Sequence, residues 1–148
     1  MKKIIVTLVI AVSSLSVFAG TTSNEENVNQ KVLTAFKTEF TSAKDVEWTV
    51  SSGYYKATFV YNERYVFAYY SENGELLGLT RYLSPLDLPL ALQNNLKKNY
   101  ESYWVSDLFE AVKSDETHYY ITVENADTKL VLRSSGNSWS TYSKTKKS

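Results

Sequence analysis

Two stretches of the chain carry an apolar or aromatic residue at every fourth position. They comprise Val28, Val32, Phe36 and Phe40 in the first stretch, and Leu88, Leu92, Leu96 and Tyr100 in the second. Because an α-helix has about 3.6 residues per turn, residues four apart lie on one face. The pattern predicts two helices that each bury this face. We expect the first helix to begin near Asn27, with Gln30 in a capping pair, and the second at Leu88-Pro89, since proline suits the first turn.

After each predicted helix the pattern changes to an alternation of apolar and polar residues, rich in tyrosine and β-branched side chains. This pattern is typical of strands. The predicted strands comprise residues 46–50, 54–61, 64–70 and 76–83 in the first half, and 103–112, 118–124, 129–134 and 138–142 in the second. Asn73-Gly74 is a strong hairpin signal, because both residues accept a positive φ. The short loops require neighbouring strands to be antiparallel.

The same order of features therefore occurs twice, with a tryptophan, a pair of tyrosines and a glycine turn after each helix. The sequence predicts two tandem repeats of one helix and four strands (α-β4), spanning residues 28–83 and 88–145 of a single domain, 28–145. Each repeat alone would have a thin core, so we expect the two to share one sheet. The predicted fold class is α+β, with a largely antiparallel sheet and both helices on one face.

The N-terminal segment has the features of a secretory signal peptide. Lys2 and Lys3 precede a short, mostly apolar stretch, and Ala19 ends a suitable cleavage site, so residues 1–19 are predicted to be removed. Residues 20–27 are polar and expected to be flexible. The chain contains no cysteine, which excludes disulfides and the attachment of a lipid after the signal. We expect a periplasmic or secreted protein with no membrane insertion after cleavage.

The charge balance argues against some partners. The full chain has 16 basic and 16 acidic residues, and removal of Lys2 and Lys3 leaves 14 basic ones, a formal charge of −2. A weakly acidic protein is a poor general binder of nucleic acid or of anionic membranes.

Several short motifs carry a resemblance to a known family. They are Ala35-Phe36, Phe40, Ala43 to Trp48, Tyr54 to Phe59, Ala68-Tyr69-Tyr70, Glu72-Asn73-Gly74, Leu88-Pro89, Tyr100 and Tyr119-Tyr120. In these residues the chain resembles the PepSY-like family of exported Bacteroidetes proteins, whose fold is like that of the β-lactamase-inhibitor protein. The resemblance spans about residues 28–142 and departs at Phe40-Thr41, where the family usually has a proline after the aromatic residue. It implies two α-β4 repeats and a non-enzymatic role, inhibitory or regulatory, in binding a peptide or protein, with no catalytic residues and no cofactor.

A search for catalytic and metal-binding motifs finds little. His118 is the only histidine, and no nucleophile-elbow pattern accompanies it. It is expected at the surface, where it could modulate binding near neutral pH. With one histidine and no cysteine, no zinc motif is present, and no phosphate-binding loop occurs. Two carboxylate pairs that a glycosidase could use are interpreted as solvated charges: Glu72 with Glu75, and Asp107 with Glu110.

Tyrosine is in excess, with 12 residues against six phenylalanines. Tyrosine suits positions that are buried at one edge and wet at the other, and it is common in recognition surfaces. Strand alternation places one residue of each tyrosine pair toward the helices and the other on the open face of the sheet. The predicted binding residues on that face are Tyr54, Lys56, His118 and Tyr120. Alternatively, the outward tyrosines only stabilise the sheet through cross-strand pairing.

Three hypotheses for function follow from these features. The first is an exported binding module that recognises a peptide or protein of the cell envelope on the open aromatic face. The second is a binder of a small ligand or carbohydrate, with a pocket between helices and sheet lined by residues such as Trp48 and Trp104. The third, a hydrolase, would depend on His118.

Overall fold

The computed structural model describes residues 21–23 and 25–148. The predicted signal peptide, residues 1–19, lies outside the described residues. The fold is built on one antiparallel sheet of nine strands, in which each strand pairs with the next along the chain. The strands are β1 (Thr21–Ser23), β2 (Lys44–Ser51), β3 (Tyr54–Tyr61), β4 (Arg64–Tyr70), β5 (Leu76–Tyr82), β6 (Trp104–Lys113), β7 (Glu116–Glu124), β8 (Thr128–Ser135) and β9 (Ser138–Lys146).

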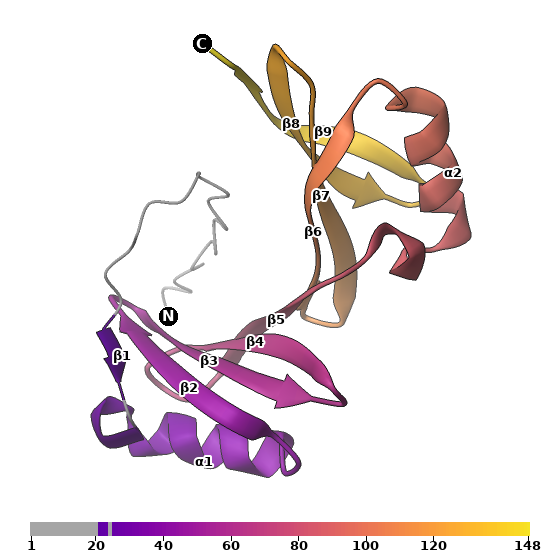
Figure 1. Ribbon diagram of the computed structural model, residues 1–148. Coiled ribbons are helices and arrows are strands. Elements are labelled where there is room, and N and C mark those ends of the chain that lie inside the picture. The colour runs from indigo at the N-terminus through magenta and orange to yellow at the C-terminus, as the bar shows by residue number, and fades with distance from the viewer. Residues whose placement is uncertain (1–20, 24) are drawn as a thin grey trace, which may run out of the picture.

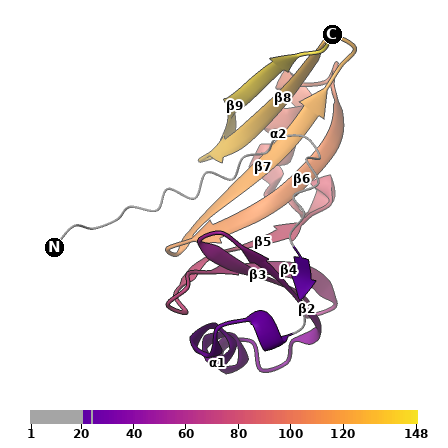
Figure 2. The ribbon, with the colours of Figure 1, turned by 90° about the vertical axis from the view of Figure 1, so that its left-hand side faces the viewer.

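Two helices cover one face of this sheet. Helix α1 (Gln30–Glu39) packs on strands β2 to β5 and α2 (Leu90–Asn99) on β6 to β9. The sheet bends where β5 meets β6, so the helices lie on its outer side and the uncovered face is concave (Figure 1). Figure 2 looks toward this uncovered face, with α2 behind the strands. The predicted α+β class with a largely antiparallel sheet is confirmed.

The register of the central strands shows that both helices lie on the same face. Leu79 of β5 packs against the core under α1 and pairs with Val112 of β6. Leu108 lies four residues before Val112 on β6, therefore on the same face, and belongs to the core under α2.

The core under α1 is built around aromatic rings. The ring of Phe36 lies edge-on to Trp48, with centroids 5.2 Å apart, and edge-on to Phe59 at 5.0 Å. Such edge-to-face pairs add about 0.5–1.5 kcal/mol each to the energy of burial. All four residues of the first predicted ladder, from Val28 to Phe40, are buried.

The core under α2 is mainly aliphatic. It combines Leu92 of the helix with Leu108, Ile121 and Leu132 of the sheet. Trp139 of β9 closes this core, and its Nε1 donates a hydrogen bond to the Leu92 carbonyl over 3.1 Å. This bond ties the last strand of the sheet to the helix.

Both helices begin later than predicted. Helix α1 starts at Gln30, because the Asn29 side chain accepts a hydrogen bond from the Lys31 amide and caps the helix. A short 3₁₀-helix, η1 (Glu25–Asn27), precedes it. Helix α2 starts at Leu90 after a second one, η2 (Pro85–Asp87), which carries its own capping box. The first residue of each ladder is nevertheless buried, since the chain before each helix also packs on the core.

The N-terminal strand β1 was not predicted. It lies in the segment 20–27, which the sequence suggested to be flexible, and it pairs with β2 at positions 48–50. Among the described residues, no helix is long and apolar enough to cross a membrane.

Candidate functional site

The sheet face that the helices leave uncovered, here called the concave face, receives the outward side chains of the central strands. In β3, Ala57 and Phe59 are buried in the core under α1. Lys56, which alternates with them, lines a cavity on the concave face, and Tyr54 lies beside Tyr69 with ring centroids 5.9 Å apart. The predicted alternation is confirmed for this half.

The same alternation holds in β7. Ile121 and Val123 are buried under α2, whereas His118 and Tyr120 line a cavity on the concave face. The four predicted binding residues therefore share one face of the sheet. They do not form one cluster, however, because Tyr54 and Lys56 are packed against β4 and the other two against β6 and β8.

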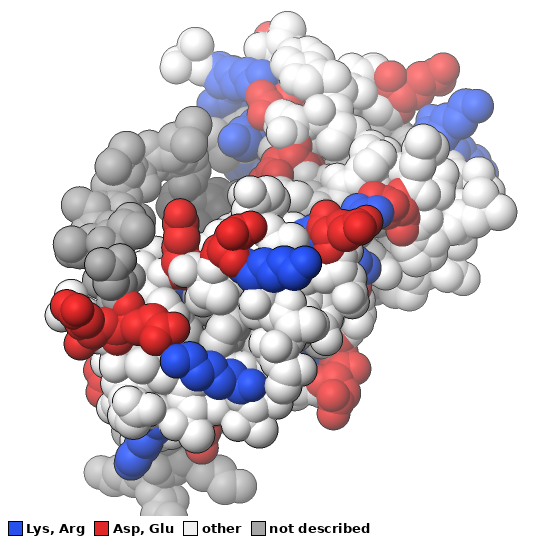
Figure 3. All heavy atoms as spheres, turned by 60° about the horizontal axis from the view of Figure 1, so that its bottom comes forward, with Lys and Arg blue, Asp and Glu red and all other residues white. Residues whose placement is uncertain are grey.

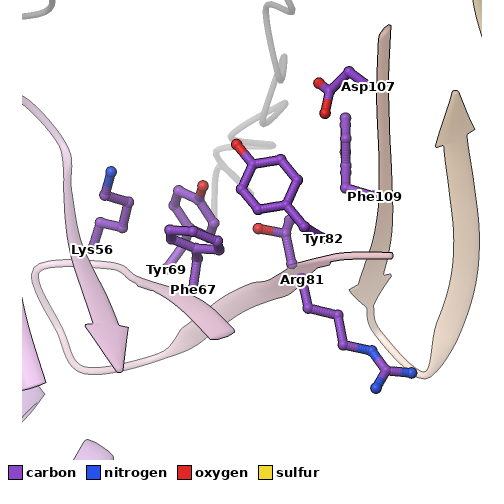
Figure 4. Close-up of a pocket in the computed structure, with 8 residues that line it drawn as sticks. Lys56, Phe67, Tyr69, Arg81, Tyr82, Asp107 and Phe109 are labelled. Carbon is purple, nitrogen blue, oxygen red and sulfur yellow. The ribbon is translucent and has the colours of Figure 1, made fainter. Parts of the chain in front are cut away.

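The first cavity of the concave face, here the Tyr82 cavity, has a volume of about 230 Å³. Its lining consists of Lys56, Phe67, Tyr69, Thr80, Arg81, Tyr82, Asp107 and Phe109. The side chains of Lys56, Tyr69 and Tyr82 rise on the same side of the sheet, while the Arg81 side chain points to the opposite side (Figure 4). Tyr82 is 60% exposed and packs edge-on against Phe67, with centroids 5.6 Å apart.

Burial changes the acidity of groups in this cavity. It raises the pKa of the Asp107 carboxyl, and the Leu108 amide and Lys129 oppose this change only in part. Burial also raises the pKa of the Tyr69 hydroxyl, against the effect of a hydrogen bond with Thr80. Lys56 Nζ lies 5.8 Å from the centroid of the Phe67 ring, within reach of a cation–π contact. The cavity can thus receive apolar or aromatic groups beside one cation and one carboxylate.

The second cavity of the concave face, here the Arg133 cavity, has a volume of about 420 Å³ and lies next to the first, with which it shares Tyr69 and Thr80. Its polar and aromatic lining includes Lys113, Glu116, His118, Tyr120, Arg133 and Tyr142. Together the two cavities form a continuous site across β3 to β9.

The rings of Tyr120 and Tyr142, which meet edge-on, line this second cavity. Tyr120 stacks on Phe109, with centroids 5.2 Å apart and ring planes at 9°. Burial raises the pKa of the Tyr120 hydroxyl, and the positive charge of Arg133 opposes it. Arg133 Cζ lies 6.0 Å from the centre of the Tyr120 ring, and its Nη2 lies 2.8 Å from His118 Nε2.

Sequence reasoning missed several residues of this site, namely Phe67, Tyr69, Tyr82, Phe109 and Arg133. The signal for them was the strand alternation already used for the tyrosine pairs, continued into the neighbouring strands. Tyr69 holds the position in β4 that faces Lys56 in the antiparallel register, so it belongs to the same face.

The pocket predicted between helices and sheet does not form around the two tryptophans. Trp48 is 1% exposed and fills the core under α1, whereas Trp104 is 53% exposed and stacks under Lys147 Nζ at 4.7 Å. A bulge between Val105 and Asp107 inserts one residue into β6, so Trp104 lies opposite Glu124, away from the helix side. The two rings therefore line no common cavity.

The Asp107–Glu110 carboxylate pair is also separated by the strand geometry. Asp107 faces the Tyr82 cavity, whereas Glu110 points to the helix side and pairs with Arg81. Two carboxylates on opposite faces of a strand cannot act on one glycosidic bond.

Among the described residues, the charged neighbours of the His118 ring are a cation and a carboxylate. Its Nε2 contacts Arg133 and lies 3.5 Å from Glu116 Oε2, which is not the arrangement of a base beside a nucleophilic hydroxyl. Within residues 25–148, no group of three histidine or acidic side chains could hold a metal ion.

A cavity on the helix side is larger but its charges are already paired. It measures about 490 Å³ and lies between the two cores. Of its charged residues, Arg81 pairs with Glu110, and Arg64 reaches Asp87 at 3.3 Å. The molecule viewed from the α1 side shows acidic and basic side chains interspersed (Figure 3). The helix side therefore offers a ligand fewer unpaired charged groups than the concave face does.

Comparison with solved structures places the fold among proteins of Bacteroides. A BLIP-like protein from Bacteroides fragilis is 22% identical and superposes with a TM-score of 0.70, covering 80% of this chain and 86% of that one. A DUF2874 family protein from Bacteroides ovatus is 20% identical, with a TM-score of 0.72 and coverage of 82% and 89%. A protein assigned to the periplasm of Bacteroides eggerthii is 15% identical, with a TM-score of 0.70 and coverage of 80% and 88%.

The chain matches no protein-family model and none of the curated proteins. At these identities the structural likeness concerns the fold and not the activity. The sheet, its two helices and these comparisons together show that the chain has the BLIP-like fold of the Bacteroides proteins.

Proposed function

We propose that the chain is an exported, non-enzymatic binding module that recognises a peptide or protein segment of the cell envelope on its concave face. The observation that carries the proposal is the pair of adjoining cavities on that face, lined by tyrosines whose rings are accessible. Tyrosines combine apolar contact area with a hydroxyl at low entropic cost, which suits recognition of a chain segment.

The shape of the site supports a segment and not a single small molecule. The two cavities share Tyr69 and Thr80, so one extended chain could occupy both. An extended chain advances about 3.3 Å per residue and presents alternate side chains to a surface. The predicted family, PepSY-like, and the duplication of an α-β4 unit are part of the same proposal. The order α1, β2–β5, α2, β6–β9 supports that duplication.

A pair of double variants tests the proposal. Replacement of Tyr69 and Tyr82 by serine removes the two rings in the middle of the concave face, and a loss of capture of envelope partners is expected. The control replaces Leu86 and Leu90, two exposed apolar residues next to and on α2, by serine, with capture unchanged. Each hot-spot ring contributes about 2 kcal/mol or more, so the loss should exceed tenfold. Equal capture by the two double variants would contradict the proposal.

A further inference from the structure

The chain has three arginines, and within the described part of the chain one of them has no acidic partner. Arg64 pairs with Asp87 and Arg81 with Glu110, and both arginines are close to half exposed. Arg133 is also partly buried, yet no carboxylate of the described residues lies within 4.0 Å of its guanidinium nitrogens. A cation that has lost part of its hydration without gaining a counter-ion is unfavourable, and an anionic ligand would remove that cost.

The guanidinium of Arg133 is held in place without being neutralised. An arginine only donates hydrogen bonds, so His118 Nε2 accepts the one from Nη2 over 2.8 Å, and the His118 proton lies on Nδ1. The Tyr120 ring, backed by Phe109, lies under the guanidinium. Arg133 Nε is buried with no acceptor among the described residues. The remaining donors are therefore oriented before any ligand arrives.

The other charged groups of the Arg133 cavity leave this cation uncompensated. Glu116 reaches His118 Nε2 at 3.5 Å, but its side chain is 79% exposed and remains hydrated. Lys113 adds a second positive charge to the lining, and Tyr69 and Tyr142 are uncharged. The positive charges of the cavity lining therefore favour the binding of an anion.

We propose that the Arg133 cavity is a carboxylate subsite, which takes the side chain of an aspartate or glutamate in an extended peptide segment of the partner. This inference rests on the proposed function and names the chemistry that the concave face selects. The planar fork of arginine matches a carboxylate, since two parallel hydrogen bonds can form. The adjoining Tyr82 cavity has one cation and one carboxylate, Lys56 and Asp107, and two phenylalanine rings in its lining, so its charges balance and it suits an apolar or aromatic residue.

The test is a selection of random linear dodecapeptides displayed on phage, with the purified protein as bait. Displayed peptides fused through their C-terminus carry no free terminal carboxylate, so enrichment of acids reports on side chains alone. We expect aspartate or glutamate in the enriched sequences. The best binder is then synthesised with both ends blocked. Changing its acid to the amide, or Arg133→Gln in the protein, should each weaken binding by about ten- to a hundredfold.

The two losses should not add, because they remove the same contact. Arg133→Lys, which keeps the charge and loses the fork, should bind with intermediate affinity. Lys98→Gln, which removes one positive charge from α2, should bind like the wild type. Binding by a blocked peptide also excludes a terminal carboxylate as the ligand. Matching thermal unfolding of the Arg133 variants and the wild type shows that folding is intact.

The outcomes separate this inference from the proposed function. The carboxylate subsite is wrong if the enriched peptides lack acids, or if they bind Arg133→Gln as tightly as the wild type. The concave binding face is still supported in that case if the same peptides lose affinity for the Tyr69→Ser/Tyr82→Ser variant. If no selected peptide depends on either set of residues, both proposals fail.

Discussion

The hairpin turn between β4 and β5 is pressed against the first turn of α1, and one glycine makes this contact possible. Gly74 has φ +83°, and a Cβ added there would meet the Lys31 carbonyl oxygen at 2.9 Å and its carbon at 3.1 Å. The Asn29 side chain also donates a hydrogen bond to the Glu72 carbonyl of this turn over 3.2 Å. Gly74→Ala is therefore expected to disturb both the turn and its packing against α1.

The expected loss of unfolding free energy in Gly74→Ala has two parts. An alanine with positive φ costs about 1–2 kcal/mol relative to glycine. The clash adds about 1–3 kcal/mol, the usual cost of overpacking, because it involves backbone atoms that cannot rotate away. Gly53 is the matched control, since it has φ +86° in the β2–β3 turn and nothing within 4 Å of an added Cβ. Only the first part applies there, so Gly74→Ala should lose about 1–3 kcal/mol more than Gly53→Ala.

Urea unfolding followed by tryptophan fluorescence measures both variants, with Trp48 buried beside α1 as a reporter. Replacing glycine by alanine also lowers the conformational entropy of the unfolded chain. This effect is similar at the two sites and cancels in the comparison. Equal losses of unfolding free energy in the two variants would refute the close contact between the turn and the helix.

Three further predictions concern the second half of the sheet, each measured as the urea midpoint. Trp139→Phe should lower the stability by about 1–3 kcal/mol through loss of the hydrogen bond to Leu92 and of buried volume, whereas Trp104→Phe at the surface should be nearly neutral. Asp107→Asn should raise the midpoint at pH 7, because burial raises the pKa of Asp107 above its unfolded value and so destabilises the ionised folded state; the gain should vanish at pH 2, where the carboxyl is protonated in both states. Glu124→Gln should lower the midpoint at pH 7, since hydrogen bonds from lysine and serine neighbours lower the pKa of Glu124 in the folded state. The stabilisation by the ionised Glu124 is complete above the usual carboxyl range and is lost as the pH falls through the lowered pKa. A midpoint shift of the same sign for both carboxyl variants at pH 7 would contradict these assignments.

Local patterns were sufficient to predict the two helices, strands β2 to β9 and the two faces of the sheet. The ladder from Val28 to Phe40 depends only on helical geometry, and the inward direction of Phe59 and Ile121 depends only on alternation along a strand. Both patterns are independent of which strands become neighbours. They therefore persist in the folded protein.

Features that depend on register or on distant neighbours could not be predicted in this way. The bulge between Val105 and Asp107 turns Trp104 away from the helix side, although the sequence suggests that it matches Trp48. The pairing of β1 with β2 uses backbone groups and leaves little trace in a three-residue strand. The lack of an acid beside Arg133 becomes visible only when β6, β7 and β8 are placed side by side.

The central claim is that the concave face, and not the helix side, recognises the partner. A photo-crosslinking amino acid placed at position 82 or at position 90 tests this claim in cells of the native organism. Tyr82 lies on the concave face and is 60% exposed, whereas Leu90 lies on α2 and is 70% exposed. The account predicts a discrete crosslinked product from position 82 and none from position 90. No product from position 82, or the same product from both positions, would contradict it.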